Sequence, residues 1–174
     1  LSDKHLISEG CGGQCAEGPH IYKKDGMYYL MIAEGGTEYA HRETIQRSAS
    51  VWGPYTPCPH NPIISHKEYK KSEIQATGHA DLVEDANGSW WLVFLGIRRF
   101  SHALLHNLGR ETFLAPVTWK DGWPVVGYNV NGTIELVMDA PLPGLEDEES
   151  KKNIHIDSKS GKPMLYSDHS VHID

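Results

Sequence analysis

The feature that most constrains the fold of this chain is a set of short motifs that occurs twice. The motifs recur in the same order, roughly sixty to seventy residues further on: Gly18 and Gly78, GMYYLMIA (26–33) and GSWWLVFL (88–95), RETI (42–45) and RETF (110–113), GPY (53–55) and GWP (122–124). Two unrelated hairpins with common turn residues would not keep four matches in order. We therefore interpret the chain as two copies of one structural unit.

Each copy has the pattern of a β-hairpin. Asp25-Gly26 and Asp121-Gly122 lie between apolar segments, and Asn87-Gly88 does the same in the second copy. Asp-Gly and Asn-Gly favour the tight turns of hairpins, and short apolar runs between turn residues are typical of all-β proteins. A plain β-sandwich is an alternative, but a repeat of this length does not favour it.

The length of the repeat predicts a β-propeller. Each copy has room for about four strands, the content of one propeller blade, and we place the blade units at about residues 13–60 and 78–127. Because a closed ring needs at least about four blades, we expect a partial propeller of about two to three blades. Residues 1–136 then form one partial β-propeller domain. Residues 137–174 form a C-terminal segment in which 153–157 and 163–166 are candidates for one further blade hairpin.

The composition of the chain limits the kinds of binding partner that we expect for it. The chain has 174 residues, of which 39% are hydrophobic and 22% charged, and its formal net charge is −7. A nucleic-acid-binding surface is usually basic, and no apolar run is long enough for a membrane helix, so we expect neither partner. The three cysteines include no Cys-x-x-Cys pair, which predicts free thiols rather than disulfides or a zinc site. Cytoplasmic and secreted locations both stay open.

Three residues at comparable blade positions are candidates for a site. Glu17 and His79 lie where the first strand of each blade would line the central channel, and Arg110 begins the third strand of the second unit. A carboxylate, an imidazole and a guanidinium that converge are typical of a site for a hydroxyl-rich ligand. Taken one at a time, they could also be a solvated strand end, a turn cap and a surface arginine. Asp81, on the same strand face as His79, is a candidate to fix the His79 tautomer.

Four segments together resemble glycoside hydrolase family 43, which contains β-xylosidases and α-L-arabinofuranosidases. They are EGPHIYKKDGMYYLMIAEGG (17–36), RSASVWGPYTPCPHNPI (47–63), TGHADLV (77–83) and LGRETFLAPVTWKDGWPVV (108–126). The similarity runs from Gly10 to about Leu136 and favours the xylosidase-type branch. It implies a five-bladed β-propeller. It also implies a glycosidase that acts on xylo- or arabino-oligosaccharides and inverts the anomeric carbon.

The resemblance also implies roles for the three candidates. Glu17 matches the general acid, Arg110 matches an arginine that contacts the sugar, and His79 matches a channel histidine beneath the sugar. That histidine often holds a calcium ion or water in relatives. We therefore expect no required cofactor, and any metal to be a single calcium near His79, held mostly by water.

The resemblance further implies that part of the catalytic machinery is missing. The family's general base is an Asp on the first blade, and a second Asp adjusts the general acid, but only sixteen residues precede Glu17. We expect a fragment without the first blades, inactive alone, whose partners are the missing blades or another copy. The alternative is a non-catalytic carbohydrate-binding propeller fragment.

Overall fold

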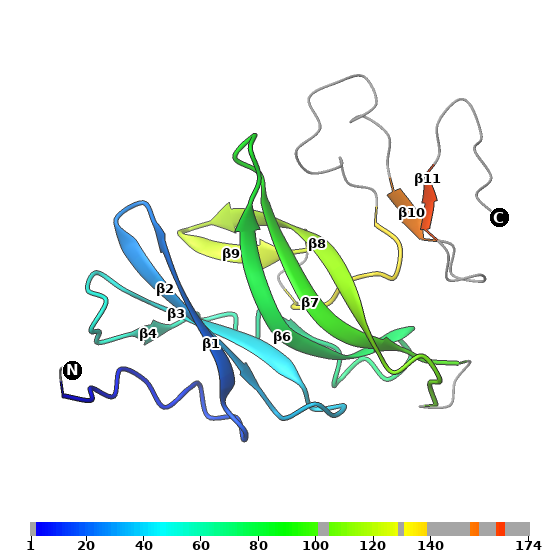
Figure 1. Cartoon of the computed structure of the whole chain (residues 1–174), viewed down its shortest axis with the longest axis horizontal. Helices are drawn as coiled ribbons and strands as arrows, with labels where there is room; N and C mark the ends of the chain where they lie inside the picture. The colour runs from blue at the N-terminus through cyan, green and yellow to red at the C-terminus, as the bar shows by residue number, and fades with distance from the viewer. Residues whose placement is uncertain (1–2, 101–104, 129–130, 139–153, 157–162, 166–174) are drawn as a thin grey trace.

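The computed structural model describes residues 3–100, 105–128, 131–138, 154–156 and 163–165, and all of their regular structure is β. Two larger sheets account for most of it and lie next to each other (Figure 1). The predicted all-β fold is therefore confirmed. None of the described segments forms a helix with the length and apolar character that a membrane span requires.

The first sheet is built from the N-terminal copy of the repeat. Its strand order is β1-β2-β3-β4, with a short β5 that also pairs with β3. The strands are β1 (Glu17–Lys24), β2 (Met27–Glu34), β3 (Arg42–Ser48), β4 (Thr56–Pro57) and β5 (Ile64–Ser65). Consecutive strands are antiparallel neighbours, so the sheet is a meander with β1 on one edge.

The second sheet repeats this arrangement in the order β6-β7-β8-β9. Its strands are β6 (Ile74–Glu84), β7 (Trp90–Arg98), β8 (Arg110–Lys120) and β9 (Trp123–Val126). A separate antiparallel pair follows, β10 (Ile154–Ile156) with β11 (Pro163–Leu165), at the position of the expected C-terminal hairpin. The rest of 139–174 lies outside the described residues, and the division at residue 136 stays a prediction.

Two tight turns have the conformation that their sequences predict. Lys24 pairs with Met27 and Lys120 pairs with Trp123, which leaves two residues in each loop. Asp25 and Gly26 have φ of 49° and 80°, and Asp121 and Gly122 have φ of 53° and 72°. Two successive positive φ values define the type I′ turn, whose twist matches that of the flanking strands.

The hydrophobic core fills the space between the two sheets. Tyr29 of β2 meets Trp119 of β8 edge-on, with ring centroids 5.0 Å apart, and Trp119 meets Trp90 at 5.4 Å. Fully buried aliphatic and aromatic side chains of both sheets complete it, among them Met31, Ile45, Ile64, Ile74, Leu92 and Phe94. Tyr29 also lies 6.2 Å from Trp123 between ring centroids, so one aromatic residue of the first copy contacts two tryptophans of the second sheet.

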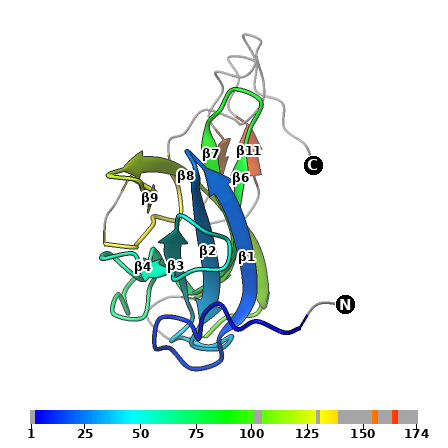
Figure 2. The same ribbon diagram turned by 90° about the vertical axis from the view of Figure 1, so that its left-hand side faces the viewer.

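One edge strand, β6, joins the sheets. It contacts β1, β2, β3 and β5 of the first sheet, so the edge strands β1 and β6 come together (Figures 1 and 2). This is the arrangement of neighbouring propeller blades, in which the first strands lie on the inside. β6 begins at Ile74, four residues before the expected start of the second unit near residue 78. The register of β6 is irregular on both sides of Gly78. Such irregularities interrupt the alternation of side chains by which a strand is recognised in a sequence.

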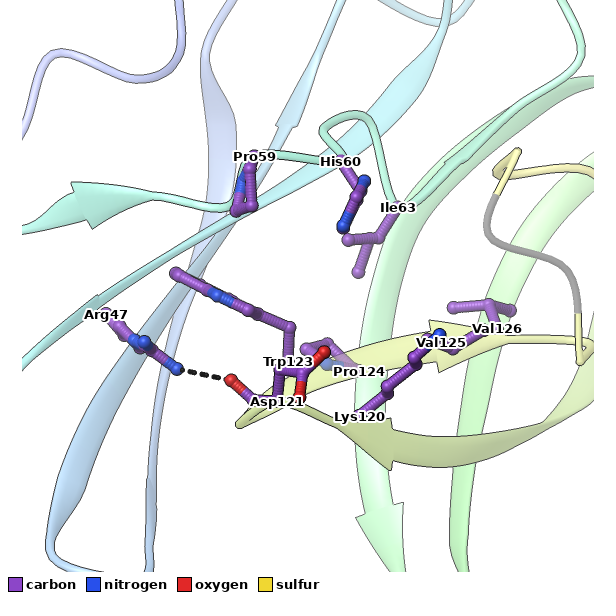
Figure 3. A pocket seen from close by; sticks show the side chains of 10 residues that line it. All are labelled: Arg47, Pro59, His60, Ile63, Lys120, Asp121, Trp123, Pro124, Val125 and Val126. Carbon is purple, nitrogen blue, oxygen red and sulfur yellow. Dashed lines mark hydrogen bonds between the residues drawn. The ribbon is translucent and has the colours of Figure 1, made fainter.

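A second link lies at the β8–β9 turn. The carbonyl oxygen of Gly122 accepts hydrogen bonds from the Tyr29 hydroxyl at 2.8 Å and from an Arg47 Nη at 2.9 Å. The Arg47 guanidinium also lies 4.2 Å from the centre of the Trp123 ring, a cation–π distance. Arg47 and Trp123 also line a pocket of about 420 Å³, shown in Figure 3, where Arg47 reaches across to the turn.

A buried histidine ties the ends of the two sheets to the chain that follows β9. His66 is 0% exposed, its Nδ1 donates to the carbonyl of Ile74 at 2.6 Å, and its Nε2 accepts the Ile134 N–H at 2.9 Å. These two contacts require the neutral ring with its proton on Nδ1. Burial lowers the pKa of His66 below its ordinary 6.5, consistent with this requirement.

We predict that His66 makes the chain less stable in mild acid. The pKa of His66 is lower in the folded chain than in the unfolded chain. As the pH falls below about 6.5, the unfolded chain therefore binds more protons than the folded chain, and the free energy of unfolding falls. His66→Gln keeps an acceptor for Ile134 and loses the donor to Ile74, which costs about 1–3 kcal/mol at neutral pH.

Urea unfolding of wild type and His66→Gln at about pH 7.5 and 5.5 measures this effect. The difference in midpoint between the two proteins is expected to shrink at the lower pH. A difference that stays constant would contradict the assigned ring state.

Candidate active site

The edge strands β1 and β6 position the first two candidate residues. Glu17 is the first residue of β1 and pairs with Ala33, after which the register shifts before His20. His79 was expected to begin its strand, but it lies inside β6, within the register irregularity between Gly78 and Asp81. Its φ of 50° is a left-handed conformation, which turns its side chain out of the regular alternation.

The repeated glycines make room for two imidazole rings. A Cβ on Gly18, whose φ is +54°, would lie 2.8 Å from His79 Nε2. A Cβ on Gly78 would lie 2.9 Å from Nε2 of a second histidine, His41. Both distances are shorter than real side chains adopt, so any residue other than glycine would displace a ring.

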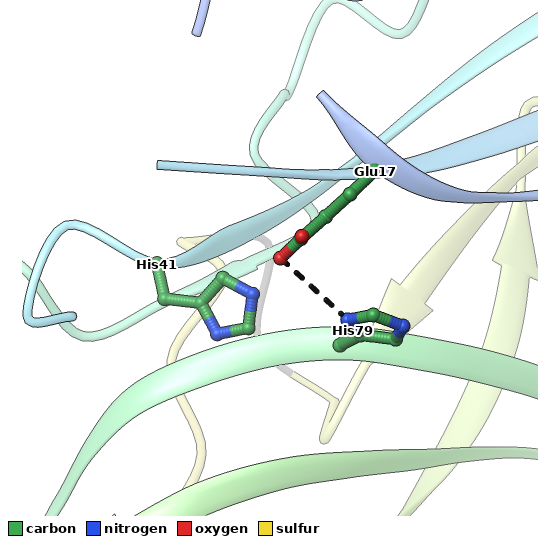
Figure 4. A group of neighbouring side chains, drawn as sticks. All are labelled: Glu17, His41 and His79. Atoms are coloured by element: carbon green, nitrogen blue, oxygen red, sulfur yellow. Dashed lines mark ion pairs between the residues drawn. The ribbon is translucent and has the colours of Figure 1, made fainter. Parts of the chain in front are cut away.

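Glu17, His41 and His79 form one cluster (Figure 4). Glu17 Oε1 lies 3.7 Å from His79 Nδ1, and the two side chains are 41% and 43% exposed. One nitrogen or carboxylate oxygen of each of the three residues lies within 4.8 Å of the others. The structure therefore brings Glu17 and His79 together and adds a third residue that our sequence analysis missed.

His41 is the buried member of the cluster. It is 0% exposed, and its Nδ1 donates to the carbonyl oxygen of Ala76 at 3.2 Å. Burial lowers the pKa of His41, and the hydrogen bond to Ala76 offsets part of that effect. A signal for His41 exists in the sequence: it directly precedes the first Arg-Glu-Thr motif, where the second copy has Gly109.

Arg110 lies in a neighbouring concavity. It is the exposed first residue of β8 and lines an open pocket of about 490 Å³ together with Tyr39, Ala76 and His106. Ala76 connects this pocket to the cluster, because its carbonyl oxygen holds His41. That Glu17, His79 and Arg110 serve one ligand stays a prediction.

Asp81 has a different role from the one expected. Its Oδ1 accepts the Tyr22 hydroxyl at 3.1 Å and lies 3.1 Å from His20 Nδ1. The same hydroxyl accepts the Leu82 N–H at 3.0 Å. Asp81 thus ties β1 to β6 through Tyr22 and His20, and the expectation that it fixes the His79 ring was wrong.

A match to glycosyl hydrolases family 43 covers residues 1–124. The chain belongs to glycoside hydrolase family 43. Its solved relatives are five-bladed β-propellers, and the two described sheets are part of such a ring. The resemblance inferred from the four sequence segments is confirmed.

Individual relatives give the extent of the similarity. A non-reducing-end α-L-arabinofuranosidase of Bacteroides ovatus is 58% identical over 122 residues, which are 70% of this chain and 23% of that protein. A xylosidase/arabinosidase of Butyrivibrio fibrisolvens is 48% identical over 127 residues, 72% of this chain and 24% of that protein. The crystal structure of a xylan β-1,4-xylosidase from Bacillus halodurans has a TM-score of 0.71 at 38% identity, covering 85% of this chain and 29% of that one. This family 43 chain spans about a quarter of the length of these relatives.

The donor atoms of the cluster are a poor match for the expected calcium. Calcium takes about six to eight oxygen ligands, whereas the cluster offers two imidazoles and one carboxylate. We assign calcium no step in the chemistry proposed below.

A buried carboxyl group supports the backbone around His79. Glu43 of β3 is 0% exposed, and its Oε2 accepts the Ala80 N–H at 2.8 Å. Burial raises the pKa of Glu43 well above its ordinary 4.5, the hydrogen bond from Ala80 offsets part of this effect, and the nearby charge of Asp81 adds to it. Glu43 therefore positions the irregular part of β6 that carries His79.

We predict that Glu43→Ala destabilises the chain by about 1–3 kcal/mol because the buried Ala80 N–H loses its acceptor. Glu43→Gln keeps an acceptor oxygen and is expected to cost less. Since the folded pKa is raised, the folded chain binds more protons than the unfolded one above pH 4.5, and wild-type stability falls as the pH rises through this range.

Glu43→Gln lacks this titration, so its urea midpoint is expected to vary less with pH than that of wild type. Chemical unfolding of the three proteins between about pH 4.5 and 8 checks both points. Equal losses for Gln and Ala would show that the hydrogen bond to Ala80 is not what Glu43 provides.

Proposed function

We propose that this chain supplies the general acid and part of the sugar-binding wall of an inverting glycosidase for xylo- or arabino-oligosaccharides. The observation that carries the proposal is the position of Glu17. It is the first residue of the inner strand β1, in the Glu-Gly-Pro-His context of family 43, and its carboxylate faces His79 across the junction with β6. The names of the relatives, α-L-arabinofuranosidase and xylosidase/arabinosidase, support this substrate class.

In the proposed reaction Glu17 gives its proton to the glycosidic oxygen as the bond from that oxygen to the anomeric carbon breaks. Water attacks the same carbon from the opposite face and gives a proton to an aspartate that acts as the base. Inverting enzymes separate the two carboxyl groups by about 6.5–9.5 Å to admit this water. The aspartate belongs to a blade that this chain does not contain, so the catalytic pair forms only in a larger assembly of blades.

The surroundings of Glu17 suit this task. Its side chain is 41% exposed, so it is within reach of a ligand, and the adjoining pocket of about 490 Å³ is within the size range of small-molecule sites. Arg110 lines that pocket and would donate to sugar hydroxyls, and the half-exposed ring of His79 would offer one further polar contact.

The alternative is a carbohydrate-binding propeller without catalysis. The two functions differ in one observable. An enzyme that contains this chain and the remaining blades hydrolyses aryl xylosides or aryl arabinosides to the free sugar and the phenol, with inversion at the anomeric carbon, whereas a binding protein retains sugars without turnover.

We predict that Glu17→Gln in such an enzyme slows substrates with poor leaving groups by about 10²–10⁴-fold. Activated aryl glycosides are expected to lose much less, because their leaving groups depart without protonation. Values of kcat/KM for xylobiose and for a dinitrophenyl xyloside measure the difference. Glu84→Gln, an exposed residue at the end of β6, is the control and is expected to leave both values unchanged. Equal losses for both substrates would show that Glu17 is not the acid.

We also predict that the 174-residue chain alone hydrolyses aryl xylosides and aryl arabinosides negligibly. An acid without a positioned base cannot activate water on the far face of the sugar. A chromogenic assay of the purified chain beside the larger enzyme tests this, and robust turnover by the chain would place the base among its own residues.

A further inference from the structure

We propose that the pocket at the β8–β9 turn binds a small aromatic carboxylate. This pocket of about 420 Å³ is the one in Figure 3. None of its lining residues belongs to the cluster around Glu17 or to the concavity that Arg110 lines. Its volume is within the range of small-molecule sites. The proposal does not rest on the proposed function, since no step of the hydrolysis involves this pocket.

The inner walls of the pocket are apolar. They are formed by buried side chains of two segments: Ile63 of the loop between β4 and β5, and Trp123, Pro124 and Val126 of β9. Figure 3 shows Ile63 on one side of the pocket and β9 on the other. Walls of this kind bury an apolar ring favourably and offer few partners to hydroxyl groups.

Cationic groups surround this apolar interior. Arg47 and Lys120 line the pocket together with one carboxylate, that of Asp121, and with the exposed His60 ring. Within the part of the chain that the structure describes, neither Arg47 nor Lys120 takes part in an ion pair. The chain as a whole has a formal net charge of −7. The pocket is thus a local excess of positive charge on an acidic protein, which attracts an anion.

Arg47 is held in place while part of its guanidinium stays available. Its Nη1 donates to the carbonyl oxygens of Asp121 and Gly122 at 3.1 and 2.9 Å, and its guanidinium lies 4.2 Å from the centre of the Trp123 ring. Among the described residues, no hydrogen bond uses its Nε or Nη2. A guanidinium fixed in this way keeps the remaining donors in the planar arrangement that matches a carboxylate.

These features distinguish between classes of ligand. A neutral sugar would need an open aromatic face or many hydrogen-bonding side chains, but Trp123 is only 7% exposed and the Arg47 guanidinium lies over its ring. An inorganic anion would use the cations and leave the apolar walls unfilled. A flat ring that carries one carboxylate uses both, with the ring between Ile63 and β9 and the carboxylate toward Arg47 and Lys120.

A ¹H–¹⁵N NMR titration of the whole 174-residue chain with sodium benzoate, at constant ionic strength, tests the site. We expect saturable shifts at Arg47, at residues 60–63 and at residues 120–126, including the indole N–H of Trp123. Benzyl alcohol has the ring without the charge, and acetate has the charge without the ring. Each is expected to bind at least about tenfold more weakly than benzoate.

Variants of the lining residues assign the contacts. Arg47→Gln is expected to weaken benzoate binding at least about tenfold, and Lys120→Gln about two- to fivefold. Asp121→Asn removes the carboxylate that repels the ligand, so binding is expected to strengthen about two- to fivefold. Asparagine also accepts the positive φ of this turn, 53°. Lys70→Gln, an exposed lysine outside the pocket, is the matched control and is expected to bind like wild type.

The NMR spectrum of each variant shows whether it folds. Because Arg47 also links the two sheets, Lys120→Gln and Asp121→Asn carry the test if Arg47→Gln does not fold. The absence of saturable shifts would overturn the proposal, as would equal affinities in these two variants and the control. Equally tight binding of acetate or inorganic phosphate would show a general anion site only. Tighter binding of xylose or benzyl alcohol would show that the charge does not select the ligand, and either result would also overturn the assignment.

Discussion

The close approach of two imidazole rings to two glycines determines how the inner edges of the sheets meet. His79 lies against Gly18 of β1, and His41 lies against Gly78 of β6, so each ring occupies the space that a side chain on the other strand would fill. The arrangement is reciprocal across the junction of the two repeat copies. A methyl group on Gly18 would push the His79 ring away from its place beside Glu17, and one on Gly78 would push away the His41 ring, so the site requires both glycines.

Two buried residues support the site, and burial shifts the pKa of each. Glu43 holds the backbone next to His79, and burial raises its carboxyl pKa, whereas burial lowers the pKa of His41 beside it. Both shifts favour the neutral form of the buried group. The buried carboxylate of Glu34, by contrast, has a cation beside it, because Arg42 Nη2 lies 2.7 Å from its Oε2.

The sequence predicted the hairpins well because their turns depend on local chemistry. Asp25-Gly26 and Asp121-Gly122 adopt positive φ wherever they occur between strands, and no tertiary contact is needed to infer this. The start of β6 and the position of His79 within it were less accessible, since register irregularities depend on what the strand packs against. Glu17 and His79 were brought together as expected from their blade positions. His41 was missed because its importance comes from the fold: it precedes β3, far in sequence from β6, and only packing places it under Gly78.

The link at Gly122 has a mechanical consequence for the inner edge. Tyr29 and Arg47, on the second and third strands of the first sheet, both donate to one carbonyl oxygen of the β8–β9 turn, at 2.8 and 2.9 Å. The first strands are held as well, because the Tyr22 hydroxyl of β1 accepts the Leu82 N–H of β6 at 3.0 Å. The two sheets are therefore fastened on both sides of the core, and the candidate site lies between strands that are each held by hydrogen bonds. Residues outside the candidate site thus set the width of the opening at the inner edge.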